Sequence, residues 1–428
     1  MAMPPRPAGD PFVGHTLRFA RRPFALPEEA MAANGGRATL DVLGAGSLVL
    51  TAHPEDVPRV LDRSGPFGKT ADFETAFGES VIATEGDVWK RQREVLDPLF
   101  RPSRIREYAD AMVECTRDWV ADWTPGERID LESEMKALTL EVLFATLFGR
   151  DLDPDADAAL YESAAGLNAF FRPTSWALPA WVPTPSRREF ARSRETLRAE
   201  VTRLIDEHDG GDGDTILGRV LAARDDDALD DEAVRDVMVG IVFAGHETTA
   251  LTLAFALHAL GRHDDVRARV HAEADALDGD PGYGDVDALD ATGRAVTETL
   301  RRYPAIHSIP RVAREDAALG PYDVPEGAQV LVSVYRAHRD PERYRDPEAF
   351  DPTRWAETPA RERDPHDFFP FGRGARACLG RRFARVEAQL VLATIARRYR
   401  LDPLADLELA PAMTTQPADG VPARVRER

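Results

Sequence analysis

Residues 371 to 380 read Phe371-Gly-Arg-Gly-Ala-Arg-Ala-Cys-Leu-Gly380, which sets a cysteine among glycines and arginines. A thiolate inside a protein needs positive charge and backbone N–H donors to stabilise its negative charge. Arg373 and Arg376 supply charge here, and the glycines let the backbone approach the sulfur. The loop therefore predicts that Cys378 is a metal-bound thiolate. A buried free cysteine in a turn is the alternative.

The run resembles the haem-binding loop of the cytochrome P450 family, whose pattern is Phe-Gly-x-Gly-x-Arg-x-Cys-x-Gly. All the fixed positions of that pattern are matched. The resemblance implies haem b (iron protoporphyrin IX) as the cofactor, with Cys378 as the ligand of the iron. It further implies that Phe371, Gly372, Arg376 and Gly380 lie against this cofactor.

Apolar residues at a period of 3.6 predict several long helices. These helices cover about 89–122, 130–148, 186–207, 231–263, 292–302 and 380–398. Two stretches, about 38–52 and 320–335, are expected to form a small β region. No repeat or low-complexity linker divides the chain. We therefore expect a mainly α protein with a small β region: a single domain, residues 1–428, which the resemblance makes a helix-rich cytochrome P450 fold around a buried haem.

An acidic residue stands beside two threonines in Ala244-Gly-His-Glu-Thr-Thr249, within the longest apolar helix. Burying such a group without purpose is costly. The resemblance implies an oxygen-activation groove, in which Thr248 bonds dioxygen, Glu247 relays protons and Ala244 faces the cofactor and substrate. In the alternative reading, Glu247 only faces polar neighbours.

Glu298-Thr-Leu-Arg301 is an acid–base pair three residues apart on a helix, and such pairs are common on surfaces. Phe350-Asp-Pro-Thr-Arg354-Trp follows it at a distance typical of the family. The resemblance implies that Glu298, Arg301 and Arg354 form a buried structural triad that supports the loop of Cys378.

Donors for the cofactor carboxylates are expected from separate segments. Trp89 and Arg93 are four residues apart and share one helical face. The resemblance adds Arg311, and together with Arg376 these residues supply four donors for two propionates. For any single one of them, a solvated surface side chain is the alternative.

Substrate contacts are expected from Ala244, Ile306 and His307, although a histidine bonded to backbone is the alternative for His307. The aromatic, proline-broken segment 170–181 is typical of a lid between two helices. Its more ordinary interpretation is an apolar loop folded on the core.

The net charge of −20 argues against a nucleic-acid partner, which needs a basic face. Lysine occurs only at positions 69, 90 and 136, which suggests either a halophilic origin or a GC-rich genome. Cys115 and Cys378 give no disulfide framework. No signal peptide, membrane anchor or apolar run of membrane-spanning length is recognisable, so we expect a cytoplasmic protein.

The resemblance implies a monooxygenase that activates O2 and inserts one oxygen atom into a small apolar organic substrate. Electrons would come from a separate ferredoxin or flavodoxin-type donor, which two basic stretches, 89–106 and 371–388, would bind. A peroxide-dependent haem-thiolate hydroxylase is one alternative. A non-catalytic haem protein that carries or senses a ligand is the other.

Overall fold

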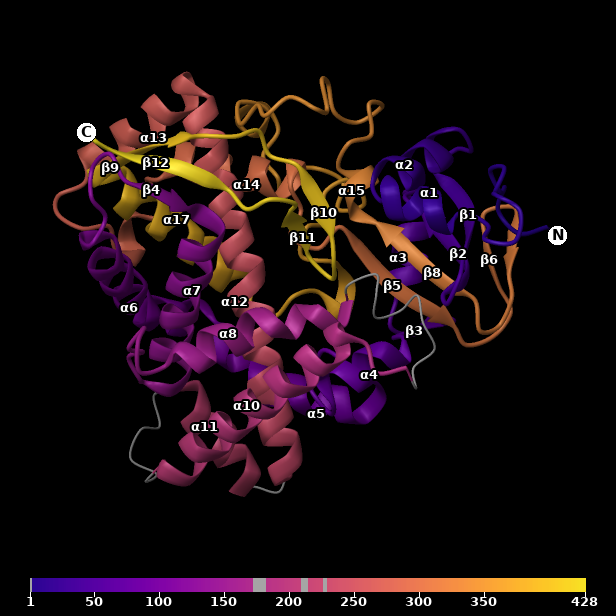
Figure 1. Cartoon of the computed structure of the whole chain (residues 1–428), viewed down its shortest axis with the longest axis horizontal. Helices are drawn as coiled ribbons and strands as arrows, with labels where there is room; N and C mark the ends of the chain where they lie inside the picture. The colour runs from indigo at the N-terminus through magenta and orange to yellow at the C-terminus, as the bar shows by residue number, and fades with distance from the viewer. Residues whose placement is uncertain (1, 172–181, 209–214, 226–228) are drawn as a thin grey trace.

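The computed structural model describes residues 2–171, 182–208, 215–225 and 229–428. Helices build most of the molecule, and the largest sheet lies at one side together with the N-terminus, whereas a smaller one lies near the C-terminus (Figure 1). Most of the segment 170–181, predicted as a lid, lies outside the described residues. The prediction of a mainly α protein with a small β region is confirmed.

The helices have the following bounds. They are α1 (Thr16–Arg21), α2 (Ala25–Ala32), α3 (Asp56–Leu61), α4 (Ala71–Phe77), α5 (Gly86–Leu96), α6 (Pro102–Ala121), α7 (Leu131–Phe148), α8 (Ala158–Gly166), α10 (Pro185–Glu207), α11 (Ile216–Asp225), α12 (Asp231–Arg262), α13 (Asp264–Ala276), α14 (Asp290–Arg302), α15 (Val334–Ala337), α16 (Arg354–Glu357) and α17 (Arg381–Arg398).

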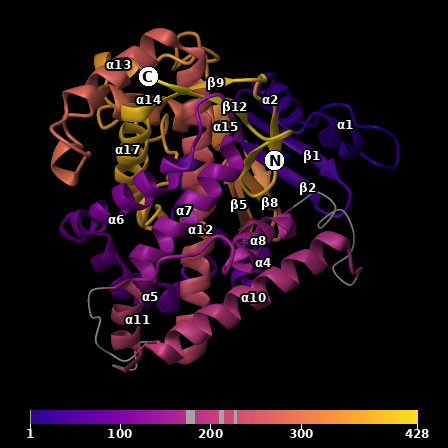
Figure 2. The same ribbon diagram turned by 60° about the vertical axis from the view of Figure 1, so that its left-hand side comes forward.

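Helix α12 runs through the middle of the molecule in both views (Figures 1 and 2). Its first turn is capped by Asp230, whose carboxylate accepts from the Ala233 N–H at 2.8 Å. It packs against α7, α10, α14 and α17. Within the described residues it is the one helix long and apolar enough to cross a membrane, and 83% of its most apolar stretch is buried inside the protein. Its apolar character is therefore that of a core helix.

The prediction of a single helix over 89–122 is wrong. The structure has two helices there, α5 and α6, with a 3₁₀ turn (Asp97–Phe100) between them. Pro98 lies within this turn and Pro102 is the first residue of α6. A proline has no N–H to donate to the preceding turn and its ring clashes with it, so the helix stops and restarts.

The main sheet has five strands in the order β1-β2-β8-β5-β3. Strands β1 and β2 form a hairpin, β8 runs parallel to β2, and the remaining pairs are antiparallel. The bounds are β1 (Arg37–Val42), β2 (Gly46–Thr51), β3 (Phe67–Gly68), β5 (Ser308–Ala313) and β8 (Gln329–Ser333). Five residues, 303–307, connect α14 to strand β5.

Smaller sheets complete the β region. One is the hairpin of β6 (Ala317–Leu319) and β7 (Tyr322–Val324). A second hairpin pairs β10 (Leu409–Pro411) with β11 (Thr415–Pro417). The third has the order β4-β12-β9, with β4 (Arg128–Asp130), β9 (Tyr399–Pro403) and β12 (Pro422–Glu427). The β10–β11 hairpin is tied to residue 305, because the Thr415 N–H donates to the Ala305 carbonyl at 2.8 Å.

Candidate active site

A cavity of about 1680 Å³ lies between α12, the loop before α17, strand β5 and the β10–β11 hairpin. Pockets that bind one drug-sized ligand have volumes of roughly 300–1,000 Å³, so this cavity has room for a large cofactor together with a ligand. Most of the predicted site residues line it. They are Trp89, Arg93, Ala244, Thr248, Ile306, His307, Arg311, Phe371, Gly372, Arg376, Cys378 and Gly380.

The loop around Cys378 is held by its own backbone. The Cys378 N–H donates to the Phe371 carbonyl at 2.8 Å, which closes the loop on itself. Gly372 and Gly374 have φ values of 65° and 68°, a conformation that side chains other than glycine rarely adopt. The cysteine side chain is open to the cavity although protein surrounds it, and α17 begins three residues later.

Enclosure by protein raises the pKa of the Cys378 thiol above its ordinary value. The Gly380 N–H and the guanidiniums of Arg93 and Arg381 act in the opposite direction and favour the thiolate. The sequence had suggested Arg373 and Arg376 for this role. In the structure the cations that act on the sulfur come from α5 and from the start of α17, because Arg376 reaches Glu85 instead.

Arg376 belongs to a cluster of cations on one wall of the cavity, together with Lys69, Arg93 and Arg311. Burial and repulsion from Arg376 lower the pKa of Arg311 to about 10. Burial followed by repulsion from the same arginine lowers the pKa of Lys69 to about 7. Among the described residues, Arg311 Nε and Arg376 Nη1 are buried without a hydrogen-bond partner. These buried cations need anionic partners in addition to Glu85 to satisfy their charge and their free N–H groups.

These features fit a haem. A cysteine faces a large cavity, and buried guanidinium donors of Arg311 and Arg376 in the same lining are free to bind the carboxylates of a porphyrin. Trp89 lies in the same wall, buried between Arg63 and Arg93, whose guanidinium carbons are 5.5 and 5.7 Å from its ring centre. Lys69 was missed from the sequence, since a lone lysine far from any motif gives no signal there.

Thr248 and Ala244 form the part of α12 that faces the cavity. The Thr248 hydroxyl donates to the Ala244 carbonyl at 2.7 Å, one turn earlier in the helix. Ala244 is the more exposed of the two within an otherwise buried helix, and both line the same space as Cys378.

Glu247 does not line the cavity, although its neighbour Thr248 does. Its carboxylate is 3% exposed and accepts from Asn168 at 2.9 Å, from Gln416 at 3.1 Å and from Thr414 at 3.2 Å. The ammonium of Lys136 lies 3.6 Å away. Burial raises the pKa of Glu247, and the Lys136 charge only partly offsets this. Thr414 itself lines the cavity, so this hydroxyl connects the acid to it.

A second buried acid, Glu387 on α17, lies on the other side of α12. Its carboxylate accepts from Thr249, which lines the cavity. Burial raises the pKa of Glu387 to about 8. Its Oε2 has no hydrogen-bond partner among the described residues. Burial thus favours the protonated form of Glu387, and no sequence motif had pointed to this residue.

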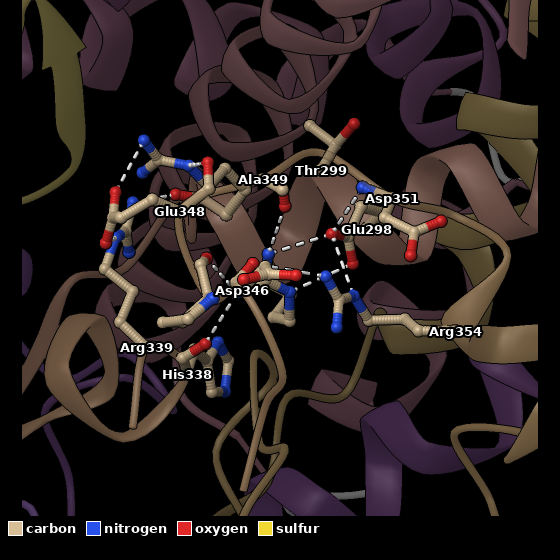
Figure 3. A network of polar contacts seen from close by, with 12 residues as sticks. Glu298, Thr299, His338, Arg339, Asp346, Glu348, Ala349, Asp351 and Arg354 are labelled. Atoms are coloured by element: carbon tan, nitrogen blue, oxygen red, sulfur yellow. Dashed lines mark hydrogen bonds and ion pairs between the residues drawn. The ribbon is translucent and has the colours of Figure 1, made fainter. Parts of the chain in front are cut away.

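Glu298, Arg301 and Arg354 meet in one buried cluster of ion pairs, in which Figure 3 shows Arg354 beside Glu298. Glu298 Oε1 accepts from Arg301 Nη2 at 2.8 Å and from Arg354 Nε at 3.2 Å, and Oε2 accepts from Arg301 Nε at 3.0 Å. The Trp355 indole and the Asp351 N–H also donate to this carboxylate, at 2.9 and 3.0 Å. Glu298 and Arg301 are fully buried and Arg354 is 8% exposed. One carboxylate thus satisfies donors from three segments.

The triad is connected to the loop of Cys378 by hydrogen bonds. Arg301 donates to the carbonyl of the buried His338 at 2.8 Å. The His338 ring accepts from the Phe369 N–H at 3.0 Å, and the Phe369 carbonyl accepts from the Gly372 N–H at 3.0 Å. Displacement of Arg301 would therefore be transmitted to the start of the cysteine loop.

Aromatic side chains from three elements, α4, the 3₁₀ turn Leu167–Phe171 and α12, pack together. Phe73 and Phe77 of α4, Phe171 and Phe243 have ring centres 4.8 to 6.5 Å apart. Three of them, Phe73, Phe171 and Phe243, line the cavity. This wall gives an apolar ligand a large contact area without a charged group.

The family model described as Cytochrome P450 matches residues 4–421. The chain belongs to the cytochrome P450 family. Members of this P450 family use haem b, and the site geometry fits that cofactor.

Curated relatives of this P450 act as oxygenases. The chain is 35% identical to cyclooctat-9-en-7-ol 5-monooxygenase of Streptomyces melanosporofaciens, over 93% of the chain and 89% of the relative. It is 31% identical to pentalenene oxygenase of Streptomyces avermitilis, over 95% and 92%. The solved heme domain of cytochrome P450DA is 29% identical, with a TM-score of 0.87 and coverage of 100% and 98%. The chain is thus a P450 monooxygenase with the P450 fold.

Proposed function

We propose that this P450 oxygenates a polycyclic, terpene-like skeleton at a C–H or C=C bond. The observation that carries the proposal is that Cys378 and Thr248 face one large cavity, whose far wall is made of aromatic side chains. The names of the relatives support a terpene-like substrate, because cyclooctatenol and pentalenene oxygenases share about a third of their residues with the chain. In the net reaction one oxygen atom of O2 enters the substrate and the other leaves as water, with two electrons and two protons consumed.

Haem b with a thiolate ligand supplies the activation and cleavage of O2 when it is bound. The role proposed for Cys378 is that ligand, supported by the Gly380 N–H and by the charges of Arg93 and Arg381. Lys69, Arg93, Arg311, Arg376 and the Trp89 indole are proposed to hold the propionates. Phe371, Gly372 and Gly380 are proposed to line the face of the macrocycle on the side of Cys378.

Proton delivery is proposed to run from Glu247 to the cavity. Its carboxyl holds a proton more readily than an exposed glutamate because it is buried. Thr414 bonds this carboxylate and lines the cavity, and Thr248 presents its hydroxyl to the same space. Lys136, which also contacts Glu132 at 2.6 Å and is 18% exposed, connects Glu247 towards the surface. Retention of this acid and alcohol argues against a peroxide-dependent enzyme.

The substrate proposal is tested by optical titration of the ferric holoenzyme. Terpenes are expected to change the spin state of the haem, since a ligand filling the cavity excludes water from it. Fatty acids, steroids and small aromatics serve as the comparison panel. Turnover with NAD(P)H and a surrogate ferredoxin system then checks for an oxygenated product. A panel in which only non-terpenoid compounds bind would contradict the proposal.

We propose a ferredoxin-type electron donor that binds over α6 and α17. Exposed basic residues of the two helices converge, because Arg106 and Arg382 contact the same Tyr283. The Arg106 guanidinium lies 5.3 Å from the Tyr283 ring centre, and Arg382 donates to the tyrosine hydroxyl at 3.4 Å. An acidic partner would be attracted to this face of an otherwise acidic chain.

Charge reversal tests this surface. At fixed ionic strength, Arg382→Glu is expected to slow reduction of the haem by an acidic ferredoxin about tenfold, because electrostatic steering sets the association rate. Stopped-flow reduction kinetics provide the measurement. Arg188→Glu makes the same charge change on α10, away from α6 and α17 (Figure 2), and is expected to leave the rate unchanged. Equal rates for both variants would count against the docking surface.

The acidic composition leads to a proposal about the host. We propose that the protein works in a salt-rich cytoplasm, where ions screen the self-repulsion of a net charge of −20. Its melting temperature is then expected to rise steadily between about 0.1 and 3 M KCl, as the screening length falls from about 10 Å to below 3 Å. A melting temperature that does not change with the KCl concentration would instead favour a GC-rich genome as the reason for the scarcity of lysine.

A further inference from the structure

His307 lies in the cavity wall formed by residues 305–309 and the β10–β11 hairpin. Its position is fixed on several sides. The His307 carbonyl accepts from the Tyr335 N–H at 3.0 Å, and its ring packs edge-on against Phe24 with centres 5.3 Å apart. The wall is tied together next to it, since Thr415 bonds the carbonyls of Ala305 and Pro304 at 2.8 and 2.6 Å. The imidazole is therefore held in one orientation.

The hydrogen bonds of the ring determine which nitrogen carries the proton. Nε2 lies 3.0 Å from the Ala412 carbonyl oxygen, which can only accept, so Nε2 is the N–H donor. Burial lowers the pKa of His307, so the ring is neutral at pH 7 and has a single N–H. Nδ1 must then carry a lone pair.

Nδ1 has no hydrogen-bond partner among the described residues. Nδ1 is not among the enclosed side-chain atoms without a partner in the described residues, so solvent or a ligand can reach it. His307 is partly buried and lines the cavity, so the space next to Nδ1 is the cavity. Thr146 and Thr252 line the same cavity and donate their hydroxyl protons to carbonyls of their own helices at 2.8 Å, which leaves hydroxyl oxygens that are weaker acceptors than an imidazole nitrogen. His307 thus presents a fixed acceptor in a largely apolar wall.

We infer that the substrate carries a hydroxyl group, which donates to His307 Nδ1 while the apolar skeleton packs on the aromatic wall. This inference rests on the proposed function and names its substrate class: an alcohol with a polycyclic skeleton, already oxygenated once. An apolar ligand would leave Nδ1 without water and without a partner, which disfavours binding. The hydroxyl also fixes one end of the skeleton, so the oxidised carbon lies at a distance from it.

The test compares matched ligands on the ferric holoenzyme. Adamantane, cedrane and androstane skeletons are each offered as the hydrocarbon, the alcohol and the methyl ether, and dissociation constants come from the spin-state change. For the skeleton that binds best, the alcohol is expected to bind about tenfold more tightly than the ether, which cannot donate. This comparison uses the unaltered protein, so it does not depend on any variant folding.

The residue is tested with His307→Phe, which keeps a ring against Phe24 but has no acceptor. Binding of the alcohol is expected to weaken about tenfold, while the ether changes by less than about twofold. Ile306→Val is the control in the same wall and is expected to shift alcohol and ether together. Equal affinities for alcohol and ether in the unaltered protein, or an unchanged ratio in His307→Phe, would overturn the inference while the terpene proposal stands. Binding of no skeleton in any form would overturn both.

Discussion

Replacing Glu298 with alanine is expected to yield a protein that does not retain haem. The substitution leaves Arg301 and Arg354 buried without their counter-charge, and it removes the acceptor of the Trp355 and Asp351 N–H groups. Breaking one side of a buried ion pair costs about 3–5 kcal/mol. The damage reaches the cysteine loop through His338 and Phe369. The haem-to-protein ratio after purification and the melting temperature measure the effect.

Glu348→Ala is the matched control for this experiment. Glu348 pairs with Arg302 at 2.7 Å and with Arg339 at 3.4 Å in the same region (Figure 3), and its side chain is 63% exposed. The buried Arg339 also donates to the carbonyls of Arg302 and Tyr335, so it keeps partners when Glu348 is removed. An exposed pair contributes about 0–1 kcal/mol, so this variant is expected to keep its haem. Full haem content in Glu298→Ala would show that the triad does not support the loop.

Replacing Glu247 with glutamine is expected to lower the rate of product formation about 100-fold, the lower range for losing a proton-transfer group. Glutamine has nearly the same shape but cannot release and regain a proton. Ligand-induced spin changes should persist, because Glu247 does not line the cavity. Product formation by the unaltered enzyme should fall as pH rises through the raised pKa of Glu247, since only the protonated carboxyl donates.

Glu141→Gln is the control for Glu247→Gln. Glu141 on α7 is also partly buried, with a pKa raised to about 7 by burial, but it does not line the cavity and contacts none of the proposed proton path. Its replacement is expected to leave turnover and its pH profile unchanged. Equal turnover in Glu247→Gln and the unaltered enzyme, measured with the same donor, would assign the proton supply to another group.

Much of the fold and part of the site were predictable because their signals are local. The helix predicted over 231–263 is present as α12, since its apolar run and Asp230 cap lie in one continuous segment. The prediction of one helix over 89–122 was wrong because the apolar spacing continues across Pro98 and Pro102, whereas the α-helical conformation is interrupted there. Strand β5 gave no strong signal because its pairing with β3 and β8 is made at long range.

The partners of the site residues were not predictable for the same reason. Glu247 stands in a recognisable motif, yet Asn168 and Gln416, which bind its carboxylate, are 79 and 169 residues away. The glycines of the Cys378 loop indicated a close approach of the backbone to the sulfur, and the Gly380 N–H does act on it, but Arg93 acts on the sulfur from another helix. Residue types within a motif indicate the chemistry, whereas the charges that tune it come from elsewhere in the chain.

The cluster of cations on one wall of the cavity affects how stable the chain is before it binds its cofactor. The cluster consists of Lys69, Arg93, Arg311 and Arg376. Arg93 and Arg376 each pair with a carboxylate, but burial and repulsion among the four cations still lower the pKa values of Lys69 and Arg311. The two carboxylates of a porphyrin are therefore expected to relieve this repulsion and to stabilise the folded chain. Cofactor binding then shifts the folding equilibrium, and chains that lack it are left for proteases. We therefore expect the amount of intact enzyme to depend on the supply of haem as well as on synthesis of the chain.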